Sequence, residues 1–337
     1  MQTESFYNQF DTVIHSFKKI LVVSHVNPDG DAIGSSLAMC FFLKKFGVDA
    51  KVLVPNDFPG FLSWMPGAHD ILIYESQTEL AQEWISTAEC IIMQDFNNLS
   101  RFGLLHNEIG KTRVPRVLVD HHRDPDMSQF CCGWSETNVS SASELVAEII
   151  LHYDENYLDE SIATDLLVGI MTDTGSFAHS IYHPRTFEIV GALVKKSISY
   201  NDIHRLVYDT FSESRLRLLG YAINKMEVLD DYSTAIIALS KSELDSFDYH
   251  VGDTEGIVNY PLSLKKIKMS VLITERQGQI RLSFRSKGEF SVHELSNKHF
   301  KGGGHTNAAG GTMDCTIEEA VEKLKSVLPD YKKMLNA

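Results

Sequence analysis

The sequence predicts a two-domain α/β protein, in which an N-terminal doubly wound parallel sheet precedes a smaller C-terminal α/β domain. Three observations support this fold class. The chain has 337 residues, and single cores stop growing at roughly 250–300 residues. Its first half alternates short apolar runs with helical stretches, the pattern of a parallel sheet wound by helices. Its second half has strand-like runs, then a glycine-rich segment and a closing helix.

The elements of the first half follow from residue periodicity. Residues 20–25 (ILVVSH) form an unbroken apolar run that predicts a buried strand. Residues 31–46 have the apolar spacing of a helix, which Gly47 ends. Further strands are predicted at residues 50–55, 70–74, 89–95 and 116–122. Helical patterns follow at residues 141–152, 160–171 and most of 185–228.

The second half has a different order of elements. Strand-like runs occupy residues 233–240, 268–275 and 280–286, and a glycine-rich loop and a helix at about residues 316–335 follow them. The change of pattern places a domain boundary between about residues 190 and 230. We therefore expect an N-terminal domain, a helical connector and a C-terminal domain, which span residues 1–190, 191–230 and 231–337.

Composition excludes several classes of protein. The formal charge of −14 excludes a broadly basic surface that would coat nucleic acid. The five cysteines are odd in number and form no C-x-x-C pair, which favours a reducing compartment without a disulfide framework. The first twenty residues lack a signal-peptide pattern, and no apolar run near them approaches the roughly 20 residues of a membrane span. We expect a cytoplasmic protein with no membrane contact.

Metal-type side chains stand at the ends of four predicted elements in the first half. At least one such side chain ends or follows each of the runs ILVVSH, ECIIMQD and RVLVDHH, and a further one follows the apolar run LLVGIM. Because the carboxyl ends of parallel strands meet at one edge of a sheet, we expect these side chains to converge there. They are His25, Asp29, Asp31, Asp95, Asp120, His121, His122 and Asp173.

Converging carboxylates repel one another unless a cation lies between them. A mixture of carboxylate and imidazole ligands suits manganese, zinc or iron, whereas magnesium prefers an all-oxygen shell. The set as a whole therefore predicts a metal site, although each residue alone would be an ordinary helix cap or structural histidine.

These residues resemble the motifs of the DHH phosphoesterase family. Residues 25–35, His-x-x-Pro-Asp-x-Asp-x-x-Gly-Ser, look like its first motif, and Asp95 looks like its second. Residues 120–122, Asp-His-His, match the motif that names the family, and residues 173–175, Asp-Thr-Gly, look like the fourth. The four motifs occur in the family's order over roughly residues 20–180.

The resemblance implies two divalent metal ions, usually manganese. One would be held by His25, Asp29 and Asp95, and the other by Asp31, Asp95, His121 and Asp173, with Asp95 bridging. Two such ions activate a water molecule and stabilise charge on a phosphoryl group. The family pattern also implies that His122 faces the substrate phosphate as a hydrogen-bond donor or general acid. Asp120 is either a ligand or a residue that orients an imidazole, and Arg101 is a candidate phosphate clamp.

A candidate anion site lies in the second half, at residues 301–311 (KGGGHTNAAGG). Glycines allow backbone N–H groups to approach an anion closely. Between residues 260 and 311 there are nine basic and three acidic residues, a charge of +6 that leaves −20 on the rest of the chain. This segment predicts a focused anion site. Its candidate residues are Arg281, Arg285, Gly302, Gly303, Gly304 and His305.

The GGGH and AAG sequences resemble the C-terminal domain associated with the DHH domain. Lys301 departs from this pattern, because many relatives have another glycine there. Together the two halves resemble the bifunctional family of nanoRNA exonucleases and 3′-phosphoadenosine-5′-phosphate phosphatases. This resemblance implies a manganese-dependent phosphoesterase whose active site lies in the cleft between the domains. It would hydrolyse short oligoribonucleotides, linear dinucleotides and 3′-phosphoadenosine-5′-phosphate by hydroxide attack on phosphorus.

The residues leave other functions open. A RecJ-like single-strand exonuclease, an inorganic pyrophosphatase and a cyclic-dinucleotide phosphodiesterase share the metal-binding half, and a non-catalytic nucleotide sensor would share the binding residues. The confined positive charge argues against long DNA, which needs an extended basic track. The expected partners are short RNA oligonucleotides and small nucleotides, and the resemblance is compatible with a homodimer.

Overall fold

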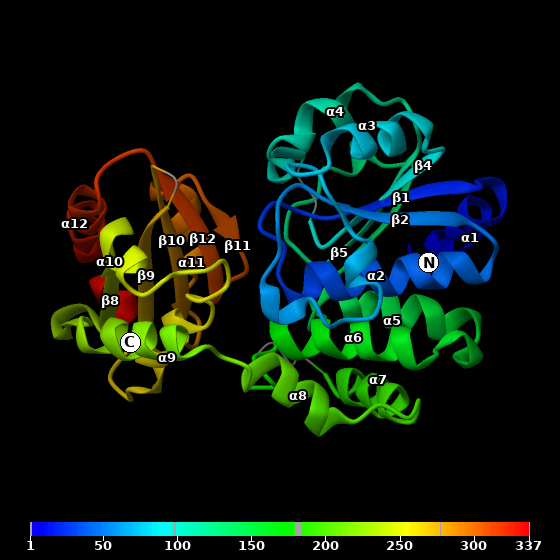
Figure 1. The fold of residues 1–337 in the computed structure, drawn as a ribbon. Coiled ribbons are helices and arrows are strands. Elements are labelled where there is room, and N and C mark those ends of the chain that lie inside the picture. The colour runs from blue at the N-terminus through cyan, green and yellow to red at the C-terminus, as the bar shows by residue number, and fades with distance from the viewer. Residues whose placement is uncertain (1, 97–98, 179–182, 277, 337) are drawn as a thin grey trace. The chain divides into compact units, whose positions relative to one another are not determined.

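The computed structural model describes residues 2–96, 99–178, 183–276 and 278–336. The chain divides into two compact units, residues 1–210 (unit 1) and residues 211–337 (unit 2), each with its own hydrophobic core. Figure 1 shows a central sheet flanked by helices in each unit. No described helix is long and apolar enough to cross a membrane.

Unit 1 contains a six-stranded, wholly parallel sheet in the order β3-β2-β1-β4-β5-β6. The order reverses between β1 and β4, which makes that point the topological switch of a doubly wound sheet. The predicted fold class is therefore confirmed for this half. The strands are β1 (Lys19–Val23), β2 (Asp49–Val54), β3 (Leu72–Ile73), β4 (Cys90–Gln94), β5 (Arg116–Asp120) and β6 (Cys132–Ser135).

Helices cover both faces of this sheet (Figure 1). Side chains of α3 (Thr78–Thr87) and α4 (Leu105–Lys111) form a core with one face. The larger core lies on the other face, with α1 (Gln2–Ser16), α2 (Gly30–Lys45), α5 (Ala142–Tyr153) and α6 (Glu160–Asp173). The helices α7 (Arg185–Val194) and α8 (Tyr200–Tyr208) also contribute to that core.

Helix α2 is buried along most of its length, between the sheet and α6. Gly34 permits this burial, because a Cβ atom there would lie 2.4 Å from the backbone oxygen of Asp165 and 3.1 Å from the backbone nitrogen of Gly169. The two helices therefore approach each other at backbone distance. This close contact places the N-terminus of α2 and the C-terminus of α6 beside the same edge of the sheet.

Unit 2 contains a mixed six-stranded sheet in the order β11-β12-β10-β9-β8-β7, in which only the β8–β9 pair is parallel. One face packs on α11 (Val292–His299) and α12 (Ile317–Leu335), and the other packs partly on α9 (Glu213–Asn224) and α10 (Lys241–Ser246). The strands are β7 (Glu227–Leu229), β8 (Thr234–Leu239), β9 (Met269–Arg276), β10 (Gln279–Ser286), β11 (Gly303–Gly304) and β12 (Ala308–Met313).

The segment predicted as a glycine-rich loop is largely a β-hairpin, formed by β11 and β12. Glycine weakens strand patterns in a sequence, so the hairpin was not foreseen. Close packing explains two of the glycines. A Cβ atom on Gly302 would lie 1.9 Å from the oxygen of Gly310, and one on Gly311 would lie 2.9 Å from Phe300.

Seven short 3₁₀ helices complete the described structure. They are η1 (Gly60–Leu62), η2 (Ala68–Asp70), η3 (Leu99–Phe102), η4 (Met127–Gln129), η5 (Glu155–Tyr157), η6 (Asp230–Tyr232) and η7 (Ile257–Ser263). The division into residues 1–190, 191–230 and 231–337 stays a prediction. In the structure, α7 and α8 belong to unit 1 and α9 belongs to unit 2.

Candidate metal centre and substrate-binding residues

The candidate metal ligands of unit 1 gather where β1, β4 and β5 end. His25 follows β1, Asp95 directly follows β4, and His121 directly follows β5. Because β1 and β4 are neighbours at the switch point, their carboxyl ends open on one crevice. Asp29 and Asp31 come from the start of α2, and Asp173 is the last residue of α6.

The first group of potential ligands is His25, Asp29 and Asp95, whose ligand atoms all lie within 4.8 Å of one another. His25 Nε2 lies 3.3 Å from Asp95 Oδ2. The other ring nitrogen, Nδ1, lies 2.9 Å from the carbonyl oxygen of Val26, which accepts its hydrogen bond. Holding the Nδ1 proton there leaves Nε2 available as a ligand.

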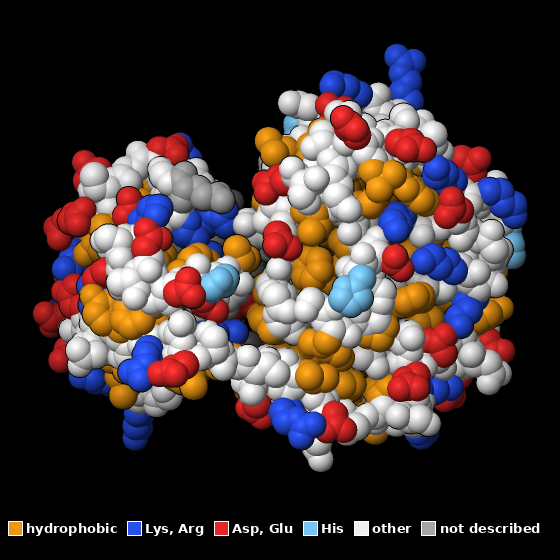
Figure 2. All heavy atoms as spheres, in the orientation of Figure 1, with side chains coloured by type: hydrophobic (Ala, Val, Ile, Leu, Met, Phe, Trp, Pro, Cys, Tyr) orange, Lys and Arg blue, Asp and Glu red, His pale blue; other side chains and the backbone are white. Residues whose placement is uncertain are grey.

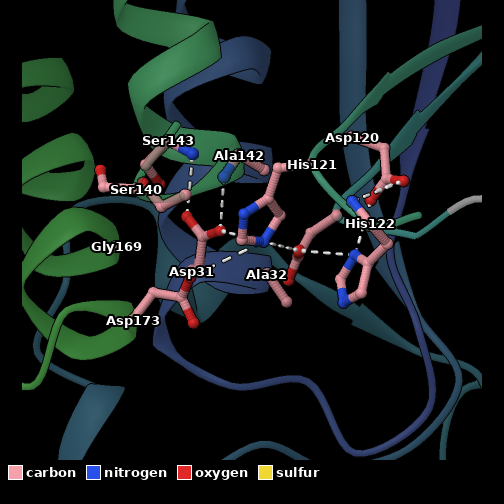
Figure 3. A network of polar contacts seen from close by, with 12 residues as sticks. Asp31, Ala32, Asp120, His121, His122, Ser140, Ala142, Ser143, Gly169 and Asp173 are labelled. Atoms are coloured by element: carbon pink, nitrogen blue, oxygen red, sulfur yellow. Dashed lines mark hydrogen bonds and ion pairs between the residues drawn. The ribbon is translucent and has the colours of Figure 1, made fainter. Parts of the chain in front are cut away.

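The second group is Asp31, His121 and Asp173. His121 Nε2 lies 3.7 Å from an oxygen of Asp31 and 3.7 Å from an oxygen of Asp173. The same nitrogen lies 3.2 Å from Asp95 Oδ1, which joins this group to the first. In Figure 3, Asp31 and Asp173 both point toward the ring of His121. Asp95 is therefore the carboxylate that the two groups share.

The carboxylate of Asp31 is held by the N-terminus of α5. The backbone N–H groups of Ala142 and Ser143 donate to its two oxygens over 2.6 and 2.8 Å (Figure 3). These amides lie at the positive end of the helix dipole, which favours a carboxylate. Gly169 of α6 provides the space that this carboxylate occupies, because a Cβ atom at Gly169 would lie 2.9 Å from Asp31 Oδ1. Sequence reasoning did not find this support, because it joins segments 111 residues apart.

The charges of the two groups are poorly balanced without a cation. Burial, together with the charges of Asp95 and Asp173, raises the pKa of Asp31 well above its ordinary value. Burial opposes ionisation of Asp95 too, but hydrogen bonds from His121 and His25 hold its pKa well below the ordinary value. Burial opposes protonation of His121, yet the hydrogen bond to Asp95 and the charges of Asp173, Asp95 and Asp31 raise its pKa to about 10. A proton on His121 therefore takes the place that a metal cation would fill.

Two further observations indicate that these residues are suited to bind a divalent metal. Asp95 Oδ1 is buried 3.2 Å from Nε2 of His121, so these two ligand atoms are placed to share one cation. The mixed nitrogen and oxygen donors are those of manganese, zinc or iron sites. Asp95 itself has a φ of 62°, in the left-handed region where aspartate is tolerated but uncommon. Such strain is concentrated at functional sites.

His122 forms a separate chain of contacts with Asp120 and Arg101. Its Nδ1 lies 2.7 Å from Asp120 Oδ1, and its backbone N–H donates to Asp120 Oδ2 over 3.1 Å (Figure 3). On the far side of the ring, Nε2 lies 3.2 Å from an Nη of Arg101. Because a guanidinium only donates, Nε2 accepts here and Nδ1 carries the proton. Burial lowers the pKa of His122, and the charge of Arg101 lowers it further, against the raising effect of Asp120.

This geometry bears on the open role of Asp120. Both of its oxygens accept hydrogen bonds from His122, so it orients that imidazole. An oxygen of Asp120 also lies within 4.8 Å of ligand atoms of Asp95 and His122. Arg101, in η3, is placed beside the His122 ring. The expected clamp residue is thus part of the same side-chain network.

In unit 2, Arg281 and Arg285 lie on one face of β10, the face opposite to the core side chains Ile280, Leu282 and Phe284. Arg285 lies opposite Ala308 of β12, next to the turn that starts at His305. The N–H of His305 donates to the oxygen of Ala308 over 2.7 Å, which closes this turn.

The glycines of the GGGH segment differ in their surroundings. Gly302 is required by close packing, and Gly304 has a φ of 139°, which side chains rarely adopt. A Cβ atom on Gly303 would meet nothing within 4 Å. Among the three, Gly303 is therefore the one at which close packing does not require glycine, and it pairs with Gly310 of β12.

Comparisons with known proteins match both halves of the chain. The family model described as "DHH family, N-terminal domain" matches residues 19–170, and the model described as "DHHA1 domain" matches residues 231–333. A crystal structure of an exopolyphosphatase-related protein from Bacteroides fragilis is 40% identical, with a TM-score of 0.92, and the match covers 99% of this chain and 98% of that one.

Two curated relatives are also similar. The first is a "Probable bifunctional oligoribonuclease and PAP phosphatase NrnA" from Streptococcus mutans, 26% identical over 94% of this chain and 96% of its own length. The second is the "Cyclic-di-AMP phosphodiesterase GdpP" of Bacillus subtilis, 25% identical over 95% of this chain and 49% of its own length.

Proposed function

Because this chain belongs to the DHH family, whose members are hydrolytic phosphoesterases, we propose that it hydrolyses short nucleotides. The proposed substrates are oligoribonucleotides of two to a few residues, linear dinucleotides and 3′-phosphoadenosine-5′-phosphate. The relative from Streptococcus mutans, which bears the name of an oligoribonuclease and PAP phosphatase, supports this choice over nearly its whole length.

The observation that carries the proposal is the convergence of two ligand groups on Asp95. His25 approaches one oxygen of Asp95 and His121 approaches the other, at 3.3 and 3.2 Å. A carboxylate approached on both oxygens is suited to bridge two cations. We propose that His25, Asp29 and Asp95 hold one divalent ion, and that Asp31, Asp95, His121 and Asp173 hold the other. We propose manganese because the donors combine nitrogen and oxygen.

The metal ions, when bound, would supply an activated water molecule and a positive field on the phosphoryl oxygens. The protein residues around them supply orientation and proton transfer. Asp31 is fixed by two amides of α5, so it presents its carboxylate without rearrangement. Such preorganisation lowers the reorganisation required during the reaction.

His122 and Arg101 act on the substrate phosphate in this proposal. Arg101 presents a planar, positively charged fork that suits two phosphate oxygens. Once Arg101 donates to the phosphate instead of to His122, Nε2 of His122 can take up a proton from a solvent water. Asp120 stabilises the resulting imidazolium through its 2.7 Å contact with Nδ1. His122 then donates that proton to the leaving oxygen.

In unit 2, we propose that Arg281, Arg285, His305 and the backbone of Gly302, Gly303 and Gly304 bind the part of the nucleotide that does not react. All three glycines are partly exposed, and nothing lies within 4 Å of the position that a Cβ atom on Gly303 would take.

The distribution of charge supports short substrates. A long polyanion requires an extended basic track to displace its counterions. On the face in Figure 2, acidic and basic side chains are interspersed among the residues drawn, and no broad basic area covers them. The excess of positive charge is confined to a short segment of unit 2.

A cyclic-dinucleotide phosphodiesterase is the second candidate, favoured by the similarity to the cyclic-di-AMP enzyme of Bacillus subtilis. This chain spans about half of that relative's length. The two candidates share the proposed metal ligands and differ in whether the substrate has a free end.

A hydrolysis panel with manganese tests the proposal. It compares RNA dimers to 24-mers, linear and cyclic di-AMP, 3′-phosphoadenosine-5′-phosphate and pyrophosphate, each with and without a chelator. We expect the highest kcat/KM for dimers or 3′-phosphoadenosine-5′-phosphate, and no turnover with the chelator. Rapid cleavage of the 24-mer with poor turnover of dimers would contradict the proposal, and preference for cyclic di-AMP would favour the second candidate.

A further inference from the structure

Arg281, already proposed to bind substrate, lies in unit 2 beside a second arginine and two hydroxyl side chains that have not been considered so far. The four side chains belong to Arg276 at the end of β9, Arg281 on β10, and Tyr249 and Thr254 from the segment between α10 and η7. We call these four residues the arginine cluster. Arg281 pairs with Thr274 in the β9–β10 hairpin, so Arg276 is its diagonal neighbour on the same face. Long side chains at diagonal positions reach each other.

The arginine cluster contains two adjacent positive charges that lack a counter-charge. In the part of unit 2 that the structure describes, neither Arg276 nor Arg281 forms an ion pair with a carboxylate, whereas the exposed Arg217 does. The neighbouring acids have other partners: Glu275 accepts from the backbone N–H of Lys241, and Asp253 accepts from that of His250. Burial lowers the pKa of Arg281, and the charge of Arg276 lowers it further.

The cluster also contains buried donors without acceptors. The Nε–H of Arg276 is buried and has no acceptor among the described residues. Its guanidinium lies over the ring of Tyr249, with Cζ 4.9 Å from the ring centroid, and an Nη donates to the Thr254 hydroxyl. The Tyr249 hydroxyl is buried beside Thr254 without an ordinary hydrogen bond. Leaving such donors unsatisfied is costly, so their retention indicates a ligand.

The donor set identifies the chemistry of that ligand. Two guanidiniums and a phenol offer several N–H and O–H donors, and burial raises the pKa of Tyr249, which keeps the phenol protonated. The two guanidiniums only donate and carry two positive charges, and with the phenolic O–H they match an anion with two negative charges and several acceptor oxygens. A terminal phosphate is such a group, whereas a phosphodiester carries one charge.

We propose that the arginine cluster is a binding site for a terminal phosphomonoester of the substrate, one that is not hydrolysed. This inference rests on the proposed function and adds residues and a ligand class to it. Arg285 lies four residues from Arg281 along β10, roughly 13 Å away. The cluster and the region of Arg285 therefore bind different parts of a nucleotide.

Two matched substrate pairs test the proposal with the full chain and manganese. One pair is an RNA dimer with and without a 5′-phosphate, and the other is 3′-phosphoadenosine-5′-phosphate and adenosine 3′-phosphate. Each pair differs only in a 5′-phosphate, so the pairs separate an oligonucleotide source from a mononucleotide source. For at least one pair, we expect kcat/KM to be about tenfold or more higher for the member with the 5′-phosphate, mainly through KM.

Variants assign that preference to the cluster. Arg276→Gln should bring the ratio within the pair close to one, and Tyr249→Phe, which removes only the hydroxyl, should lower it several-fold. Arg217→Gln is the control, because it removes an exposed arginine of the same unit that pairs with Glu213 (its side chain is 69% exposed). It should keep the wild-type ratio.

The outcomes distinguish this inference from the function on which it rests. Hydrolysis of both members of each pair with equal KM would overturn the assignment of the cluster and leave the proposed function intact. An unchanged preference in both Arg276→Gln and Tyr249→Phe would do the same. Hydrolysis of none of the four substrates would overturn the proposed function, and the inference with it.

Discussion

The sheet edge of unit 1 that bears the candidate metal ligands and the arginine cluster of unit 2 each gather charges of one sign. The charges are negative in unit 1 and positive in unit 2. In unit 1, the carboxylates of Asp31, Asp95 and Asp173 surround one imidazole, so the site attracts a cation. In unit 2, Arg276 and Arg281 lie side by side without a carboxylate partner among the described residues, so the site attracts an anion. Like charges that are buried together indicate a ligand of opposite charge.

The two regions gather their charges in different ways. The metal-type side chains of unit 1 come from loops that follow separate parallel strands, and the sheet order brings those loops together. The arginines of unit 2 come from one antiparallel hairpin, where alternation along the strands places them on one face. The first arrangement can surround a small ion on several sides, whereas the second offers an open surface to a larger anion.

The strongest test of the comparison removes the carboxylate that both ligand groups of unit 1 share. Asp95→Asn should lower kcat by on the order of 10³-fold or more, because a neutral amide cannot bridge two cations. Steady-state hydrolysis of an RNA dimer measures the effect, and circular dichroism checks the fold. Asp49→Asn, at an exposed carboxylate of the same unit, is the control and should retain wild-type activity. Wild-type activity in Asp95→Asn would remove the metal assignment.

The pH dependence of metal binding distinguishes the two regions. In unit 1, a proton on His121 occupies the place of a metal cation and must leave when the metal binds. The pKa of His121 is about 10 in the metal-free protein, so this imidazole is protonated at neutral pH. A metal ligand must be neutral imidazole, so binding expels the proton. The affinity for manganese should therefore rise by up to about tenfold per pH unit between pH 6 and pH 8.

Calorimetry in buffers of different ionisation enthalpy counts the protons that manganese releases. We expect about one proton from His121 at pH 7, and about one fewer in His121→Asn. An affinity that is constant from pH 6 to pH 8, without proton release, would contradict the assignment of His121 as a ligand.

A smaller effect is expected at Arg285, which lies on the same face of β10 as Arg281. Arg285→Ala should raise KM for short nucleotides by about tenfold, the loss of a charge-assisted contact, and leave the affinity for manganese unchanged. Steady-state kinetics measures KM, and a metal titration of the same preparation measures the affinity for manganese. If KM stays at the wild-type value for every nucleotide in the panel, Arg285 does not bind substrate.

The smallest effect is expected at Lys301, the residue before the glycine run. Lys301 has a φ of 47°, in the region that favours glycine, and its exposed side chain lies 3.8 Å from the exposed Asp314. An exposed pair of this kind contributes little. Lys301→Gly should therefore raise stability by about 1 kcal/mol, through relief of backbone strain, with less than a twofold change in kcat/KM. Urea denaturation measures it, and a clear loss of stability would show that the lysine side chain contributes.

Much of the fold of unit 1 could be predicted from the sequence. The predicted strands at residues 20–25, 50–55, 89–95 and 116–122 each contain most of an observed strand, because buried parallel strands are continuous apolar runs. Strand β6 (CGWS) lacks such a run and was not predicted. The hairpin of β11 and β12 was missed because glycine has low strand propensity, while close backbone packing requires glycine there.

The candidate site could be predicted in part. The eight metal-type residues were found because each stands next to the end of a strand or helix, where sequence patterns are clearest. The groups that hold these side chains in position were not predicted. The amides of Ala142 and Ser143 that hold Asp31, and the position of Arg101 against His122, join segments far apart in the chain. The contacts of the arginine cluster were missed for the same reason, because Arg276 on β9 meets Tyr249 and Thr254 of a different segment.

The sequence by itself determined which residues are candidates for the chemistry and which family the chain resembles, because strand ends and motif spacings are local properties. Only the tertiary structure decided which oxygen of Asp95 meets which imidazole, which ring nitrogen of His122 carries a proton, and which arginines have no carboxylate partner among the described residues. These properties depend on burial and on contacts between distant segments. Electrostatic interactions in a buried site vary steeply with such distances, and the order of residues along the chain does not contain them.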